Sequence, residues 1–229
     1  MRFSVMIATL GGIGLLAAAT QGPQRADSWT TRFRFEPQDL RATGRHPYFV
    51  LEPGDQLVLA DGRDTLAITV LAETRVVDGV ETRVVEERET TAGAIVEISR
   101  NFYAISSRTN SVYYFGEEVD IYANGKVTSH GGAWRSGVRG ARFGLMMPGT
   151  PLVGSRYYQE IAEKVAMERA QILSTTERYA APAGRYDDVL LMEETTPLEP
   201  GHKEYKQYAP GVGLIVDGSL TLVRFGNRP

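Results

Sequence analysis

The sequence contains no cysteine. This absence excludes disulfides, a thiol nucleophile and a lipid-modified cysteine behind an export signal. Histidine is also scarce: His46, His130 and His202 lie far apart, and none has a second histidine at metal-ligand spacing. We therefore expect no metal and no cofactor, and we expect the histidines to be exposed loop residues.

An excess of basic residues is also lacking, because 25 lysines and arginines face 28 acidic residues. A nucleic-acid-binding surface needs a basic face, so nucleic acid is not an expected partner. After the N-terminus, no run is long and apolar enough to cross a membrane. The remaining chain is long enough to bury a hydrophobic core, and its oligomeric state stays open.

The first residues do carry an apolar run, from residue 5 to residue 19, without a charge. It is shorter than the ~20 residues of a spanning helix, and it ends in Ala17, Ala18 and Ala19, the small residues that signal peptidase reads. We predict a cleaved signal peptide over 1–19 and a secreted or periplasmic protein; an uncleaved anchor is the alternative. Residues 20–46 are predicted to be a polar extension or linker, and 47–229 a single β-rich domain.

Turn signals divide this domain into short runs of β-branched and aromatic residues. Asp61-Gly62, Asp78-Gly79 and Asn124-Gly125 each lie between such runs, which is typical of β-hairpins. Many antiparallel strands accumulate twist, and exposed edges invite pairing with other chains. The pattern predicts a mainly β fold: a strongly curved antiparallel sheet, or a half or closed barrel, with at most one or two short helices.

Three stretches interrupt this regular pattern. The glycine-rich residues 131–154 are incompatible with a regular helix or a long strand. Residues 161–173 fit either a helix or a strand; we favour a short helix or turn up to about Met167, then a strand to Tyr179. The stretch KEYKQYAPGVGLI, residues 203–215, is expected to be a corner between two strands rather than a ligand site.

Motifs of known catalysis are missing. There is no Gly-x-Ser-x-Gly elbow and no phosphate-binding glycine-rich lysine motif in the mature chain. Two acidic runs remain, Glu86, Glu87, Glu89 and Glu117, Glu118, Asp120. Strand alternation puts Glu87 and Glu89 on one face and Glu118 and Asp120 on another. Solvated strand faces are the favoured interpretation, and whether the runs form a site is left open.

Longer motifs resemble a family of exported bacterial single-domain β proteins of unknown function. They are PYFxLxPG at 47–54, VYYFGE at 112–117, PAGxYDDV at 182–189 and TPLEPGxxEYKxYAPGVGL at 196–214. The resemblance implies export and one β domain, and it transfers no activity. A more remote analogy, at the level of the fold, is to the half-barrel carriers that hold the lipid chains of lipoproteins.

Together these observations favour a non-enzymatic exported β domain that binds a hydrophobic or amphipathic ligand, such as a lipid or another apolar small molecule, on its concave face. The candidate ligand-binding residues are Arg135, Arg139 and Arg142, for the polar end, with Tyr114, Tyr158 and Tyr205. No residue is assigned a catalytic role. The alternatives are a carboxylate-based, glycosidase-like hydrolase using Glu87 and Glu118, and an envelope module that binds another protein.

Overall fold

The computed structural model describes residues 28–227, so the predicted signal peptide lies outside the described residues. These residues form an all-β fold with one short 3₁₀ helix, η1 (Pro37–Asp39). The strands are β1 (Leu40–Arg41), β2 (Arg45–His46), β3 (Phe49–Val50), β4 (Asp55–Asp61), β5 (Asp64–Val77), β6 (Val80–Thr91), β7 (Ala94–Ser106), β8 (Val112–Ala123), β9 (Lys126–Ser129), β10 (Trp134–Arg135), β11 (Arg142–Met147), β12 (Arg156–Tyr158), β13 (Glu160–Ile161), β14 (Arg169–Ala181), β15 (Gly184–Thr195), β16 (Glu204–Ala209), β17 (Gly213–Asp217) and β18 (Leu220–Asn227). Among the described residues, no helix has the length and hydropathy needed to span a membrane.

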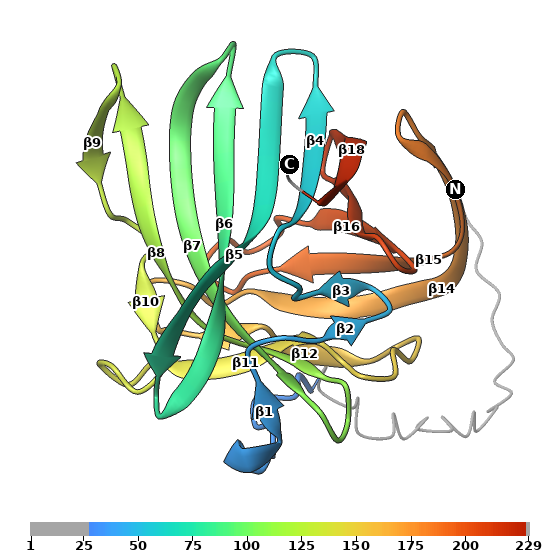
Figure 1. Ribbon diagram of the computed structural model, residues 1–229. Coiled ribbons are helices and arrows are strands. Elements are labelled where there is room, and N and C mark those ends of the chain that lie inside the picture. The colour runs from blue at the N-terminus through green and yellow to red at the C-terminus, as the bar shows by residue number, and fades with distance from the viewer. Residues whose placement is uncertain (1–27, 228–229) are drawn as a thin grey trace, which may run out of the picture.

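Thirteen strands follow one another in an antiparallel sheet, in the order β12-β14-β15-β16-β17-β18-β4-β5-β6-β7-β8-β11-β13. The two strands at the ends of this order, β12 and β13, are separated in the sequence by Gln159 alone, so the sheet is nearly closed into a barrel. Figure 1 shows the long strands β5–β8 crossing β14–β16 on the other side of the molecule. The predicted curved antiparallel sheet is confirmed.

Tight turns explain the long hairpins. Asp78 and Gly79 join β5 to β6 with φ of 50° and 79°, and Asn124 and Gly125 join β8 to β9 with φ of 52° and 73°. Positive φ at both central positions matches the right-handed twist of the flanking strands. The Asp-Gly and Asn-Gly signals therefore identified real hairpins at both places.

Alternate residues of β7 belong to different cores. Tyr103 and Ile105 face the barrel interior, whereas Phe102 and Ala104 belong to a smaller cluster on the outer face. That outer cluster is covered by the described part of the predicted extension, where the ring of Phe35 lies 5.0 to 6.1 Å from three aromatic rings. The strands in this part of the sheet are therefore buried on both sides.

The irregular stretches resolve into turns and short strands. Ala162–Val165 form a turn and β14 begins at Arg169, so the turn alternative is correct and no helix forms there. The glycine-rich stretch contributes β10 and β11. Gly144 in β11 is required by a close backbone approach, because a Cβ atom there would lie 2.2 Å from the carbonyl oxygen of Gln159.

The hairpin β2–β3 crosses the barrel and is anchored at its turn. The backbone N–H of Gly211 donates to the carbonyl of Pro47 at 2.7 Å, and the hydroxyl of Tyr48 donates to the carbonyl of Asp188 at 2.9 Å. His46 is 1% exposed, which corrects the expectation of an exposed loop histidine. Its Nδ1 accepts from the N–H of Tyr48, so Nε2 carries the proton and donates to the carbonyl of Pro148.

Candidate ligand-binding cavity

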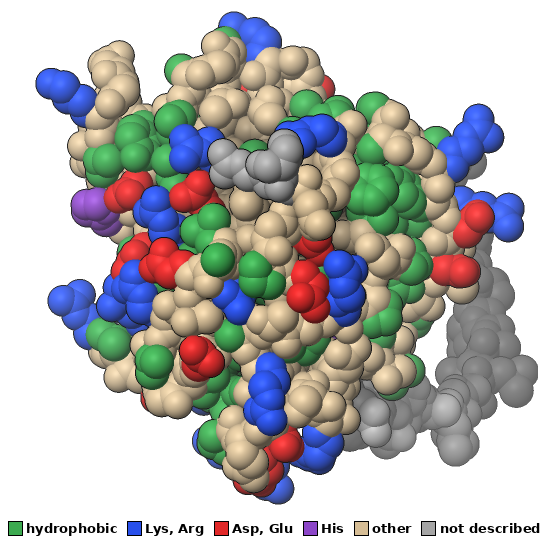
Figure 2. Space-filling model, viewed as in Figure 1, with side chains coloured by type: hydrophobic (Ala, Val, Ile, Leu, Met, Phe, Trp, Pro, Cys, Tyr) green, Lys and Arg blue, Asp and Glu red, His purple; other side chains and the backbone are tan. Residues whose placement is uncertain are grey.

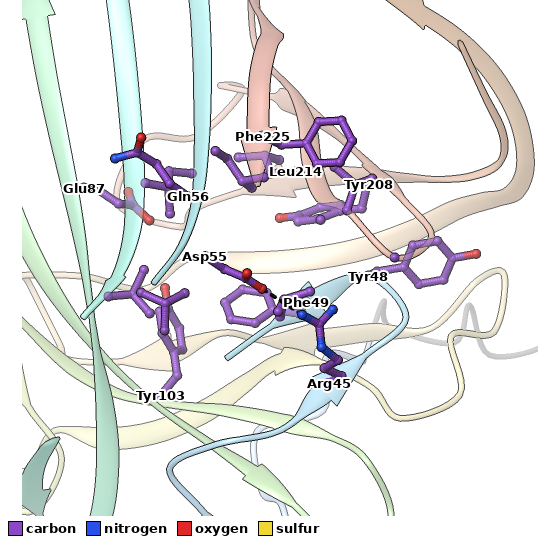
Figure 3. A pocket seen from close by; sticks show the side chains of 18 of the residues that line it. Arg45, Tyr48, Phe49, Asp55, Gln56, Glu87, Tyr103, Tyr208, Leu214 and Phe225 are labelled. Carbon is purple, nitrogen blue, oxygen red and sulfur yellow. Dashed lines mark hydrogen bonds and ion pairs between the residues drawn. The ribbon is translucent and has the colours of Figure 1, made fainter. Parts of the chain in front are cut away.

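A cavity of about 390 Å³ lies inside the barrel, between the β2–β3 hairpin and the inner face of the sheet (Figure 3). Its walls come from the hairpin, from β4–β7, from β11 and from β16–β18, together with the corner between β16 and β17. The lining residues are Arg45, Tyr48, Phe49, Val50, Asp55, Gln56, Leu57, Ile68, Val70, Val85, Glu87, Tyr103, Met146, Lys206, Tyr208, Gly211, Val212, Gly213, Leu214, Asp217, Phe225, Gly226 and Asn227.

Most of this wall is aliphatic or aromatic. Leu57, Ile68 and Val70 form one side, and the rings of Phe49 and Tyr103 meet edge to face with centroids 5.0 Å apart. The corner residues 211–214, which were expected to be architectural only, also line the cavity. The corner thus connects two strands and shapes a binding space at the same time.

Two tyrosine hydroxyls in this apolar wall have no hydrogen-bond partner among the described residues. Tyr103 is 4% exposed and Tyr208 is 2% exposed. Figure 3 shows both hydroxyls directed into the space that Glu87 also faces. The two hydroxyls thus face the open space of the cavity, where they are available to a ligand group.

Glu87 is the most perturbed carboxyl group in the cavity wall. It has no hydrogen bond or ion pair with any described residue, and burial raises its pKa to about 7. The positive charge of Lys206 lowers this pKa, whereas the charges of Asp217, Glu89 and Glu97 raise it further. Glu87 therefore changes its protonation state near neutral pH, and either form can bind a ligand group.

Lys206 already has two anionic partners. Its Nζ lies 3.3 Å from Glu194 Oε2 and 3.2 Å from Asp217 Oδ1. Burial disfavours the charged amine, yet these carboxylates outweigh burial and raise the pKa of Lys206. Glu194 also accepts a hydrogen bond of 2.7 Å from Gln159, so its charge is held in place.

A second cavity, of about 450 Å³, lies beside β8 and β10. It is lined by Glu117, Glu118, Ala133, Trp134, Arg135, Val138, Arg139, Ala141, Ala162, Glu163 and Val165. Burial, followed by the charge of Glu87, raises the pKa of Glu117 to about 8. Tyr114 connects the two cavities, because its ring stacks on Tyr103 at 4.8 Å and meets Trp134 at 5.2 Å.

The six candidate residues from the sequence are not brought together, and none of them lines the first cavity. Arg135 and Arg139 line the second cavity, where Arg135 also forms an ion pair with Glu118, and Arg142 is exposed at the start of β11. Tyr114 is buried and donates to Asn101 Oδ1 at 2.6 Å. The other two tyrosines lie elsewhere: Tyr158 is next to Trp29, and Tyr205 is 45% exposed and donates to Glu193.

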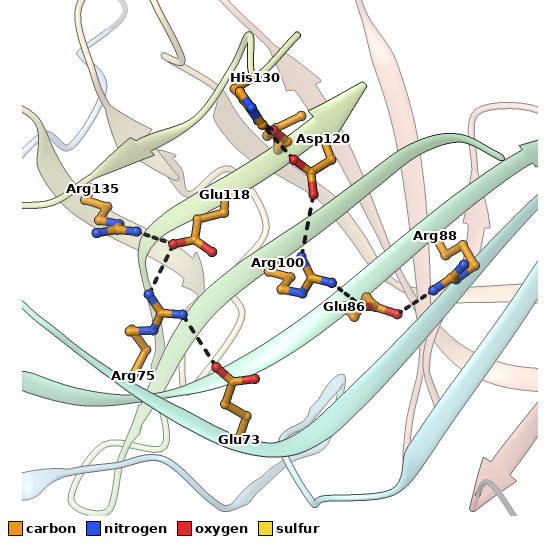
Figure 4. A network of polar contacts seen from close by, with 10 residues as sticks. Glu73, Arg75, Glu86, Arg88, Arg100, Glu118, Asp120, His130 and Arg135 are labelled. Atoms are coloured by element: carbon orange, nitrogen blue, oxygen red, sulfur yellow. Dashed lines mark hydrogen bonds and ion pairs between the residues drawn. The ribbon is translucent and has the colours of Figure 1, made fainter. Parts of the chain in front are cut away.

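The acidic runs divide between the two faces of the sheet. On the outer face, a network of ion pairs joins carboxylates to arginines from neighbouring strands (Figure 4); its members are Glu73, Arg75, Glu86, Arg88, Arg100, Glu118, Asp120, His130 and Arg135. Figure 2 shows acidic and basic side chains interspersed over the region of β5–β8 on the face drawn. Glu87 and Glu118, the pair considered for a hydrolase, lie on opposite faces.

The residues that sequence reasoning missed are Glu87, Lys206, Tyr103 and Tyr208 as members of one wall. Each lies on a strand with inward-facing neighbours two positions away, such as Val85 beside Glu87 on β6. Alternation shows which residues share a face, but it does not show which face is enclosed. Among the described residues, no group of three or more histidine, aspartate or glutamate side chains could hold a metal ion.

Comparison with known proteins finds no family model, no curated protein and no solved structure that matches this chain. The family resemblance carried by the sequence motifs stays a prediction.

Proposed function

We propose that this chain is an exported, non-enzymatic binding protein that holds a small hydrophobic or amphipathic molecule inside its barrel. The observation that carries the proposal is the partly open cavity of about 390 Å³, with a mainly aliphatic and aromatic wall and several polar groups within it. Ligand sites are typically apolar clefts of roughly 300–1,000 Å³ with a small number of placed polar groups. Export rests on the sequence of residues 1–19 alone.

The arrangement of the hairpin supports a carrier role. The β2–β3 hairpin covers the cavity, and Arg45 on it forms an ion pair of 3.2 Å with Asp55 on β4 at the edge of the wall. The side chain of Arg45 is 57% exposed, so this pair can open at small cost. A ligand would enter where the hairpin meets β4.

A neutral fluorescent amphiphile, N-phenyl-1-naphthylamine, tests the proposal. We expect saturable binding at one site with micromolar affinity. Ile68→Trp fills the cavity from β5 and should abolish this binding, whereas Val76→Trp places the same ring on an exposed position of the same strand and should leave binding unchanged. Circular dichroism checks that both variants fold. Failure of the dye to bind, or equal binding by both variants, would overturn the proposed function.

A further inference from the structure

The charge around Glu87 is not balanced by the protein. The charged groups that act on it are Lys206 on β16, Asp217 on β17, Glu89 on β6 itself and Glu97 on β7. Glu87 in turn raises the pKa of Tyr103 on β7 and of Glu117 on β8. Lys206 is the only cation in this set, and it already forms ion pairs with Glu194 and Asp217. Ionised Glu87 therefore has no counter-charge of its own among the described residues.

The strand register adds to this excess of negative charge. Glu89 on β6 lies directly opposite Glu97 on β7, two positions beyond the pair of Glu87 and Ser99. Like charges directly opposite each other on neighbouring strands are destabilising. Burial raises the pKa of both Glu89 and Glu97, and each carboxylate adds to the negative field that acts on Glu87. A cation placed at Glu87 would relieve this repulsion.

The aromatic wall suits the same kind of group. Tyr103 and Tyr208 offer hydroxyl oxygens that can accept an N–H bond, and neither hydroxyl has a partner among the described residues. A ligand carboxylate at this position would instead face Glu87 and Asp217. The polar end of the cavity thus favours a cation and disfavours an anion.

We propose that the ligand is an amphipathic amine, with its protonated nitrogen against Glu87 and the hydroxyls of Tyr103 and Tyr208, and its apolar part along Leu57, Ile68 and Val70. This inference rests on the proposed function and specifies the chemical class of its ligand. The contact is an ammonium–carboxylate hydrogen bond in a partly enclosed site, where such a bond is stronger than at a fully exposed surface.

The test uses dodecylamine, dodecanol and dodecanoate, which share one chain length and differ in head-group charge. Each compound is titrated, below its critical micelle concentration, as a competitor of N-phenyl-1-naphthylamine bound to the full chain. We expect dodecylamine to bind at least about tenfold more tightly than dodecanol, and dodecanoate to bind most weakly. The affinity for dodecylamine should rise as pH increases through about 7, because Glu87 then ionises.

Glu87→Gln and Glu86→Gln form a matched pair, since the two residues are adjacent on β6 and face opposite sides of the sheet. Glu87→Gln should reduce the preference for dodecylamine over dodecanol about tenfold while dodecanol binding persists, which also shows that the variant folds. Glu86→Gln should leave the order of affinities unchanged. If dodecanoate binds as tightly as dodecylamine, or if Glu87→Gln keeps the preference, the amine proposal is wrong and the proposed function stands. If none of the three displaces the dye, and the dye itself does not bind, the proposed function fails as well.

Discussion

The sheet carries two pairs of adjacent glutamates whose members face opposite sides. Glu86 forms ion pairs with Arg88 at 3.3 Å and Arg100 at 3.1 Å on the outer face, whereas Glu87 faces the cavity without a partner. In β8, Glu118 pairs with Arg75 and Arg135 on the outer face, whereas burial raises the pKa of its neighbour Glu117 to about 8. One peptide unit separates a neutralised carboxylate from an unneutralised one.

This contrast shows where the molecule tolerates a cost in stability. Surface ion pairs contribute little, but they leave no charge without a partner. A buried carboxyl group that must ionise without a cation destabilises the folded state. The outer face supplies five arginine or histidine partners for its carboxylates, whereas Glu87 on the inner face has no partner among the described residues. The same strands therefore form ion pairs on one face and line the cavity with the other.

The largest loss of stability is expected in the hydrophobic cluster on the outer face of the sheet. Phe102 is fully buried on the outer side of β7, and the guanidinium groups of Arg75 and Arg135 lie 5.5 and 6.0 Å from the centre of its ring. Phe102→Ala should lower the free energy of unfolding by about 3–5 kcal/mol, measured by urea denaturation. A loss below about 1 kcal/mol would show that the outer cluster is not a core.

The next largest effect is a pH-dependent difference between adjacent glutamates. Burial raises the pKa of Glu87 to about 7 in the folded protein, above its ordinary value of 4.5. The contribution of Glu87 to the free energy of unfolding is therefore most favourable below pH 4.5 and becomes less favourable as pH rises to about 7. Glu87→Gln should therefore stabilise the protein by about 3 kcal/mol above neutral pH and by almost nothing in acid.

Glu86→Gln is the control for this change. It removes two ion pairs at the outer face and should lower stability by about 1 kcal/mol or less, with no gain at high pH. Equal pH profiles for the two variants would contradict the difference between the faces. Glu117→Gln should behave like Glu87→Gln, and the two gains should not be additive because the charge of Glu87 raises the pKa of Glu117.

A smaller effect distinguishes two stacked tyrosines. Tyr114 donates to Asn101 at 2.6 Å, whereas the hydroxyl of Tyr103 has no partner among the described residues. Tyr114→Phe should cost about 1–2 kcal/mol in thermal or urea unfolding, because it leaves a buried amide oxygen with an unmade bond. Tyr103→Phe should leave stability unchanged within error and weaken ligand binding instead. The reverse order would remove Tyr103 from the proposed site.

The smallest effect concerns the outer network itself. Arg100 lies 3.1 Å from Glu86 and 3.8 Å from Asp120, and its side chain is 34% exposed. Arg100→Gln should lower stability by about 0.5–1 kcal/mol at low salt, and the loss should shrink as salt is added. Chemical denaturation by urea at several salt concentrations measures this. A salt-independent loss would indicate that the pair acts through packing.

The sequence was informative wherever a local rule determines the structure. Asp78-Gly79 and Asn124-Gly125 mark hairpins because few residues adopt positive φ at two successive positions. Alternation within β8 also predicted that Glu118 and Asp120 share a face, and both belong to the outer network of ion pairs. These rules depend on neighbours in the chain, and they were sufficient for a curved antiparallel sheet.

The cavity depends on contacts between residues far apart in the chain, which local rules do not describe. From the sequence, His46 is expected in an exposed loop. In the structure its ring is hydrogen-bonded to the carbonyl of Pro148, and the adjacent Pro47 accepts a hydrogen bond from Gly211 in the corner between β16 and β17. The sequence does not show which of Tyr205 and Tyr208 lies on the inner face of β16. Closure of the barrel directs Tyr208 to the cavity and leaves Tyr205 exposed. The three candidate arginines flank glycines in the sequence, which suggested an anion-binding loop. In the fold, Arg135 and Arg139 line the second cavity, beside β8 and β10.

The pairing of β4 with β18 has a consequence for the order of folding. It joins residues 55–61 to residues 220–227, so a strand near the start of the fold completes its hydrogen bonds only when the last strand is present. Contacts between such distant residues carry an entropy cost of loop closure before they stabilise the chain, so they form more slowly than local hairpins. The β5–β8 hairpins can form early, whereas the cavity, which includes walls from β4 and β18, is complete only at the end of folding. The cavity is therefore the last part of the fold to be completed.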